Sequence, residues 1–303
     1  IQINTKDIPV RNTLSLSLGG NWNDATCFRN FKHADHSSSF PNDGNVGLLG
    51  SGLLNDWRVK TKTPIADIKA SADWSHKWHI NGMSVGMVGT LNYTSETRTY
   101  KDMQNNLFGV YDITNDRSNY LRNSTDNQYN DNKRLGALLN LALLSKSGNN
   151  KYELKNIFNR IDNNRYTDRS GVNAQSDNEI GAEYYYRSRT TTNTQLTCKH
   201  TLPHDLLEWD LSYSYANRRM PDRKHYTIDD ALEHGTMILT AGNEINREFT
   251  KLDEHIMSAN FNEKHDFKFG SFEPSLKLGG YGEYRSRKYK TRQFIYSWDM
   301  EEN

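Results

Sequence analysis

The chain has 303 residues, 35% of them hydrophobic, and its 38 Lys and Arg side chains nearly balance 37 Asp and Glu. This balance argues against a nucleic-acid partner, and the low apolar content is unusual for a soluble core of this size. No stretch approaches the about 18 apolar residues of a membrane-spanning helix, which excludes helical spans and leaves strands open.

The first residues, 1–5, alternate like a strand in progress. Because the chain starts without Met or a leader, we expect it to be a fragment whose signal peptide lies upstream. A second strand is predicted over 13–23, where Leu alternates with Ser before Trp22. This period of two places one set of side chains on each face of a strand. A long polar connection is expected over 24–64.

A hairpin is predicted next. Its strands are expected over 65–78 and 83–94, and between them Asn81-Gly82 is the kind of pair that favours a tight hairpin turn. Ile, Ala and Trp occupy one face of the first strand, whereas Lys, Ser and Asp occupy the other. Few large aliphatic residues follow, so a polar loop is expected over 95–132.

The middle of the chain repeats this arrangement. Strands are predicted over 135–143 and 152–161, with a turn of Ser, Gly and Asn between them. A polar loop is expected over 162–179. A long Thr-rich strand over 180–200 then turns tightly, at a segment that contains Pro, into a strand over 206–217.

The last third of the chain begins with a polar loop expected over 218–249 and a strand over 252–262. A ninth barrel strand starts after Pro274, and the chain stops inside a loop expected over 286–303. Tight turns and long loops therefore alternate, as they do at the two ends of an outer-membrane barrel. The prediction is an all-β, antiparallel transmembrane β-barrel that is incomplete, with about nine barrel strands.

The apolar rows of these strands are expected to face lipid. Strands of about ten residues exceed the usual five or six, and the apolar rows end in aromatic residues, as membrane-interface girdles do. A soluble barrel or sandwich with its apolar face inward is the alternative that alternation leaves open. The residues predicted to face lipid are Leu14, Leu16, Leu18, Leu139, Leu141, Leu207, Trp209 and Leu211.

Several stretches resemble the TonB-dependent outer-membrane receptors that carry a carboxypeptidase-regulatory-like domain ahead of the plug. These stretches are residues 1–9, 206–215, 218–222 and 274–284. The resemblance implies that residues 1–9 end the plug domain and that 10–303 form the N-terminal part of a barrel of the outer-membrane receptor type. It also implies a complete barrel of about 22 strands with a plugged lumen.

The resemblance further implies energy-coupled uptake of a scarce, bulky nutrient across the outer membrane of a Gram-negative bacterium. The nutrient would be a siderophore–iron complex, cobalamin, a peptide or a glycan. The expected partners are outer-membrane lipid, the extracellular solute and, through the missing N-terminal region, the TonB complex. A surface lipoprotein partner stays open, and no nucleic acid is expected. Because the TonB box, most of the plug and the closing strands are absent, this chain alone should not transport.

Three rival interpretations remain. An open diffusion porin has the same wall without a plug. An outer-membrane hydrolase has a barrel with a catalytic site. A secreted β-sandwich adhesin has the same alternation without any membrane contact.

Five arginines are predicted to lie at the outward ends of two strands. A guanidinium offers forked donors to carboxylates, so these side chains are candidates for contact with an anionic chelate or a sugar acid. The more ordinary interpretation is that they pair with Asp and Glu in the barrel wall or contact lipopolysaccharide phosphates. The five are Arg218, Arg219, Arg223, Arg285 and Arg287.

Other chemistry is not expected, and the chain is predicted to be no enzyme and to hold no cofactor or metal. His33-Ala34-Asp35-His36 lies in a polar loop, where solvation explains it better than metal binding. His204-Asp205 and His265-Asp266 lie in predicted short turns, without a nucleophile nearby, and Asp is common in turns. Asp126 and Asp131 lack the spacing of a calcium loop.

The two cysteines, Cys27 and Cys198, do not suggest a disulfide framework. They are expected near opposite ends of their strands, so a bond between them would have to cross most of a membrane. Both are predicted to be free thiols.

Overall fold

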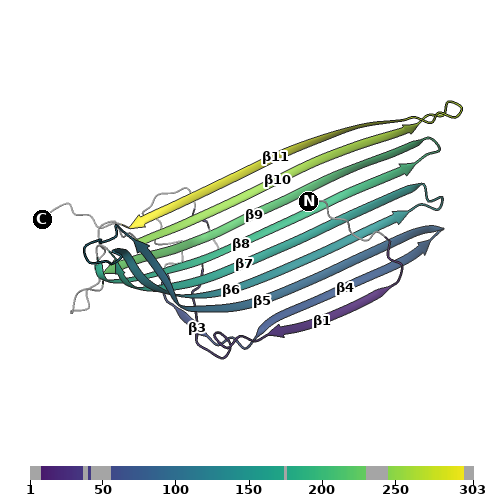
Figure 1. Cartoon of the computed structure of the whole chain (residues 1–303). Helices are drawn as coiled ribbons and strands as arrows, with labels where there is room; N and C mark the ends of the chain where they lie inside the picture. The colour runs from purple at the N-terminus through teal and green to yellow at the C-terminus, as the bar shows by residue number, and fades with distance from the viewer. Residues whose placement is uncertain (1–7, 37–39, 42–55, 174–175, 230–244, 297–303) are drawn as a thin grey trace.

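The computed structural model describes residues 8–36, 40–41, 56–173, 176–229 and 245–296, and every regular element within them is a strand. The strand expected over 1–5 and most of the plug segment 1–9 lie outside the described residues. Nine strands form one curved antiparallel sheet (Figure 1). In order across it they are β1 (Thr13–Asn21), β4 (Asp67–Ile80), β5 (Met83–Phe108), β6 (Tyr120–Leu144), β7 (Asn150–Asn173), β8 (Ser176–Thr201), β9 (Asp205–Asp229), β10 (Ile245–Asp266) and β11 (Ser275–Tyr296).

Two short strands, β2 (Phe31–His33) and β3 (Lys60–Lys62), pair in a separate antiparallel sheet. None of the described residues belongs to a helix with the length and apolarity needed to cross a membrane.

The tight turns gather at one end of the large sheet, on the right of Figure 1, because each joins two antiparallel neighbours. These connections are 81–82, 145–149, 202–204 and 267–274. Asn81 and Gly82 have φ values of 50° and 83°, the left-handed conformations that a two-residue hairpin turn requires. The predicted hairpin at this position is therefore confirmed, as are the nine strands of the large sheet.

At the other end, which we call the far end, the strands reach further than predicted. The loop expected over 95–132 is wrong in its bounds, since only residues 109–119 connect β5 to β6. The loop expected over 162–179 is almost entirely strand, formed by the ends of β7 and β8. Predicted loops 218–249 and 286–303 are also strand in their described parts, apart from a few residues within them that lie outside the description.

The cause of these errors is that both faces of the strands are polar at the far end. Gln128 of β6 and Thr167 of β7, for example, are cross-strand partners with side chains 3.5 Å apart. The backbone ladder and such polar pairs hold the strands together without an apolar row, so the alternation used to predict strands is absent. The expected loop 24–64 likewise contains β2 and β3.

One face of the sheet is apolar over the half that lies nearer the tight turns. Residues that pair across strands share a face, and the register places Leu16, Ala72, Leu91, Ala137 and Phe158 in one row. We call this surface the apolar face and the opposite one the polar face.

The two faces differ in burial in an unusual direction. On the apolar face, Leu16 is 74% exposed, Leu139 42% and Leu211 50%, whereas Asn140 on the polar face is 4% exposed. Side chains converge on the concave side of a curved sheet and diverge on the convex side, so this difference assigns the polar face to the concave side. The leucines therefore do not converge on a dry core.

The hydrophobic core of the described residues lies instead at the far end. There, Phe31 of β2 packs against Tyr129 at a ring distance of 5.6 Å, and Trp57 packs against Tyr184 at 5.7 Å. Tyr129 shares its face with Leu139, because the two are ten residues apart in β6 and no register shift with β7 separates them. The small sheet thus covers the far part of the face whose other half carries the exposed leucines.

Candidate functional site

A β-bulge in β9 decides where the arginines of this strand point. Register shifts occur between Tyr184 and Ser188 of β8 and between Glu248 and Thr250 of β10, so β9 has one residue more than either neighbour. Asp222, inside this stretch, has φ 60°. An extra residue of this kind reverses the alternation of the strand beyond it.

Asp222 is held in place by a buried ion pair. Its carboxylate accepts two hydrogen bonds from the guanidinium of Arg247, at 2.7 and 2.6 Å. Both side chains are almost completely buried. The two-pronged contact fixes the bulge and therefore the orientation of the residues that follow it.

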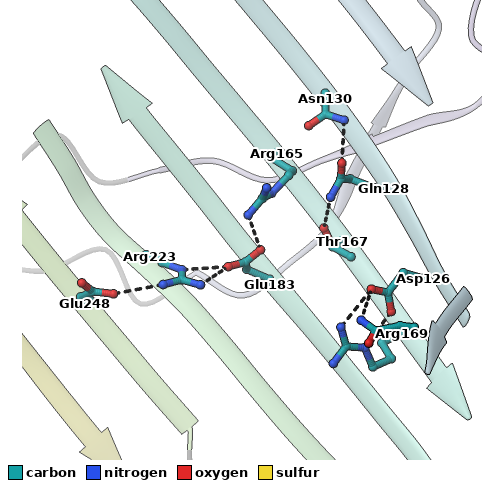
Figure 2. Close-up of polar contacts among 10 residues, drawn as sticks. Asp126, Gln128, Asn130, Arg165, Thr167, Arg169, Glu183, Arg223 and Glu248 are labelled. Atoms are coloured by element: carbon teal, nitrogen blue, oxygen red, sulfur yellow. Dashed lines mark hydrogen bonds and ion pairs between the residues drawn. The ribbon is translucent and has the colours of Figure 1, made fainter. Parts of the chain in front are cut away.

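Beyond the bulge, the polar face carries a network of ion pairs at its far end (Figure 2). Glu183 of β8 accepts hydrogen bonds from Arg165 of β7 at 2.7 Å and from Arg223 of β9 at 2.8 Å. Arg223 also contacts Glu248 of β10 at 3.3 Å. This chain of charges links four consecutive strands.

A second pair continues the network on β6 and β7. Arg169 donates to both carboxylate oxygens of Asp126, at 2.7 and 2.9 Å, and Asn105 adds a third hydrogen bond at 2.9 Å. In Figure 2 this pair lies beside the Arg165–Glu183 contact, with Gln128 and Thr167 linked nearby. The polar face at the far end is therefore a fixed lattice of donors and acceptors.

The network borders a depression of about 440 Å³. Its wall includes Asp126, Arg165, Arg169, Glu183, Arg223 and His225. Three guanidiniums and two carboxylates of this wall belong to the network, and Glu248 adds a third carboxylate through Arg223. The depression thus offers many polar groups with almost balanced charge.

The charge states in the depression follow from its geometry. Burial raises the pKa of the Glu183 carboxyl, but the neighbouring Arg165 and Arg223 outweigh it and leave that pKa below its ordinary value. Burial similarly opposes Arg169 at Asp126, and the pKa of Asp126 is also lowered. Burial and Arg223 both lower the pKa of His225, which favours its neutral form.

The five predicted arginines do not form one cluster. Arg223 lies in the depression, whereas Arg219, before the bulge, faces the other way and pairs with Asp253 at 2.8 Å. Arg285 and Arg287 lie on the polar face of β11, and both contact Glu254 of β10.

Glu254 is six residues from Glu248, the partner of Arg223, which corresponds to about 20 Å along β10. Arg218 also lies on the polar face, and its Nε is buried without a hydrogen-bond partner. Ion pairing within the wall, the more ordinary of the two interpretations, describes Arg219, Arg223, Arg285 and Arg287.

All eight residues predicted to face lipid lie on the apolar face. The register connects them through one alternation from β1 to β9. They are Leu14, Leu16, Leu18, Leu139, Leu141, Leu207, Trp209 and Leu211.

The structure separates the residues considered for metal binding. Asp126 lies on the polar face with Arg169, whereas Asp131 lies on the opposite face with Lys62, so the two cannot share a cation. Asp35 pairs with Lys60, and the ring of His36 stacks on Tyr186 at 3.4 Å. Across the described ranges, no three His, Cys, Asp or Glu side chains are placed to hold a metal ion.

The histidine–aspartate pairs lie at the end with the tight turns, far from the depression. His265 Nδ1 contacts the carboxylate of Asp205 across β9 and β10, and the N–H of Asp266 donates to the carbonyl of His204. Cys27 and Cys198 are both free and buried, as predicted.

The network residues were missed because they lie in ranges assigned to loops. A signal was present: Arg165, Thr167 and Arg169 repeat polar types at every second position, as one face of a strand does. Polar alternation of this kind is weaker evidence than apolar alternation, because solvated loops are polar too. No family model, curated protein or solved structure matches the chain.

Proposed function

We propose that this chain is part of a TonB-dependent outer-membrane receptor that admits a bulky solute without covalent chemistry. In this proposal the convex apolar face contacts lipid and the concave polar face lines the passage. The observation that carries it is the inverted burial of the sheet: leucines are exposed on one side while Asn140 is buried on the other. A soluble sandwich would place its apolar residues in the dry interior.

The height of the apolar region fits a membrane. In β6 it runs from Leu135 to Leu143, eight residue steps, or about 26 Å along the strand. Outer-membrane barrels carry an apolar band about 25 Å tall. The polar network lies beyond this band, where the strands would project from the membrane.

The apolar band crosses the strands obliquely, which supports a barrel wall. The row of Leu18, the last leucine of β1, meets β6 at Leu135. The row of Leu278 in β11 meets β7 at Asn150 and so passes beyond Leu144, the end of β6. Such a stagger from strand to strand accompanies the tilt of strands in a closed barrel.

The two edges of the sheet support an incomplete barrel. β1 and β11 are the outer strands in the order of the sheet, and the described residues give neither a second partner. Unpaired backbone groups are too costly in hydrocarbon, so a membrane wall must continue until it closes. We infer that further strands complete it.

The receptor assignment rests on the resemblance of residues 1–9, 206–215, 218–222 and 274–284 to TonB-dependent receptors. It implies the TonB complex as energy source and a surface lipoprotein as an open possibility. The depression beside Glu183 suits a solute rich in hydroxyl and carboxylate groups, because donors and acceptors are both present there.

The lipid contact is tested with spin labels on neighbouring residues. Cys is introduced at Leu211 and, as the matched control, at Ser212, in the full chain inserted into phospholipid bilayers. We expect the label at 211 to collide mainly with dissolved oxygen and the label at 212 mainly with a water-soluble nickel chelate. Equal accessibility of the two labels would contradict the proposal.

Uptake is tested in the native host. Deletion of the gene is expected to abolish uptake of one bulky solute, and a proton uncoupler should have the same effect on the parent strain. Passage of small solutes that persists with the uncoupler and is lost with the gene would identify an open porin instead.

A further inference from the structure

Basic side chains gather on the apolar face where its leucine-rich half ends. Arg219 of β9, Lys251 of β10 and Lys290 of β11 are direct cross-strand partners and form one row. Lys288 and Arg292 lie on the same face of β11, on either side of Lys290. We call these five residues the basic patch.

Like charges that face each other directly across strands are destabilising. The nearest carboxylate is Asp253, which contacts Arg219 at 2.8 Å and Lys251 at 3.6 Å and also accepts a hydrogen bond from Tyr215. One carboxylate does not offset five cations. The patch therefore has a local excess of positive charge, although the whole chain is almost neutral.

The patch borders a concave site. A depression of about 670 Å³ is lined by Lys251, Asp253, His255, Lys288 and Lys290, with Phe40 and Pro41 on another side. Phe40 packs edge-on against Phe249, with ring centres 6.4 Å apart. The site thus combines several ammonium groups with an apolar wall.

The position of the patch indicates what kind of anion it meets. Tyr284 and Met257 are cross-strand partners on the leucine-bearing half, and Lys288 follows Tyr284 by four residues, about 13 Å along the strand. Tyr213, two rows from the patch, donates or accepts a hydrogen bond with His255 at 2.9 Å. Aromatic residues followed by cations are the order expected from hydrocarbon to headgroup level.

We infer that the basic patch binds the phosphate groups of an anionic lipid in the outer leaflet. This inference rests on the proposed function, because it requires lipid at the leucines. Lysine ammonium groups bind phosphate as point charges, and several can share one phosphate. The lipid source is favoured over free phosphate because the cavity adjoins the surface assigned to acyl chains. A solute in the passage cannot reach it, since the patch faces away from the polar network.

The test measures lipid retained by the full chain extracted in mild detergent. The probe is a lipid A carrying two phosphates, titrated with native mass spectrometry as readout. The variant is K288Q/K290Q, and the matched control is K155Q/K199Q, which removes the same charge from the polar face. We expect the patch variant to lose about tenfold or more in lipid A affinity, and the control to lose less than twofold.

Two further arms make each outcome decisive. The charge-retaining K288R/K290R should bind lipid A within about threefold of the parent chain, and millimolar inorganic phosphate should not displace the lipid. Equal binding by K288Q/K290Q and the parent, or full displacement by inorganic phosphate, would overturn the inference. The spin labels at 211 and 212 separate the two proposals: oxygen contact at 211 with unselective lipid binding would refute only the basic patch.

Discussion

Arg219 and Arg223 are four residues apart in β9, yet they lie on opposite faces of the sheet. In a regular strand this spacing would place them on the same face, but the bulge at Asp222 adds one residue between them. One arginine therefore joins the basic patch on the outer surface, and the other joins the ion-pair network on the concave surface. The bulge distributes charge between two sites with different surroundings.

Loss of the buried ion pair at the bulge should be costly. Asp222→Ala leaves the guanidinium of Arg247 buried beside a residue that adopts φ 60° unfavourably. We expect the free energy of unfolding to fall by about 3–5 kcal/mol. Urea denaturation in detergent, followed by tryptophan fluorescence, measures it. As a control, Asp35→Ala removes an exposed pair with Lys60 and should cost below about 1 kcal/mol. Equal costs would show that the bulge contact does not stabilise the sheet.

The ion-pair network should make the far end sensitive to acid. The pKa of Glu183 is lowered in the folded chain, so its contribution to stability is complete above the unfolded value of about 4.5 and is lost as the pH falls through the folded value. We expect Glu183→Gln to be less stable than the parent at pH 7 and to lose less stability between pH 5 and pH 3.

The measurement is the urea midpoint at each pH. Glu273→Gln, which changes an exposed carboxylate in a short turn, should keep the acid dependence of the parent. An unchanged acid dependence in Glu183→Gln would argue that the network does not hold this carboxylate in its charged form.

The two faces should respond differently to a buried charge. If Leu139 lies near the middle of the hydrocarbon, Leu139→Arg should cost about 2–4 kcal/mol in a phospholipid bilayer. Asn140→Arg places the same charge on the polar face and should cost much less. Reversible urea unfolding from vesicles compares the two. Similar costs would be incompatible with the assignment of faces.

The leucine-bearing half of the sheet was predictable from the sequence because one face there is apolar and the other polar. Leu139, Asn140 and Leu141 alternate visibly, and the Asn81-Gly82 pair marks a turn whose backbone only certain residues adopt readily. The nine strands of the sheet follow from such signals.

The far end was not predictable in the same way. There the strands are held by ladder hydrogen bonds and by pairs such as Arg165–Glu183, so the sequence has the composition of a solvated loop. The bulge was also missed, because Asp222 is an ordinary residue whose left-handed backbone depends on the neighbouring strands. Without the bulge, the faces of Arg219 and Arg223 cannot be assigned from their spacing.

The packing of the small sheet on the far end gives a last prediction. Phe31 is 1% exposed and contacts Tyr129 and the ammonium of Lys62, so it anchors β2 and β3 to β6. Phe31→Ala should cost about 3–5 kcal/mol where the small sheet meets β6, because the cavity cannot refill easily. The leucine-bearing half, which shares no contact with Phe31, should keep its lipid-inserted structure.

Limited proteolysis of the chain in lipid vesicles tests this division. Cleavage within residues 24–64 should become at least tenfold faster in Phe31→Ala, while the strands between the tight turns stay protected. Phe28→Ala removes an equally large ring from the same segment, but Phe28 is 64% exposed, so cleavage should be unchanged. Faster cleavage in both variants would mean that the segment is held by its backbone rather than by the Phe31 ring. Protection in both would place the anchor elsewhere, at the contact between Trp57 and Tyr184.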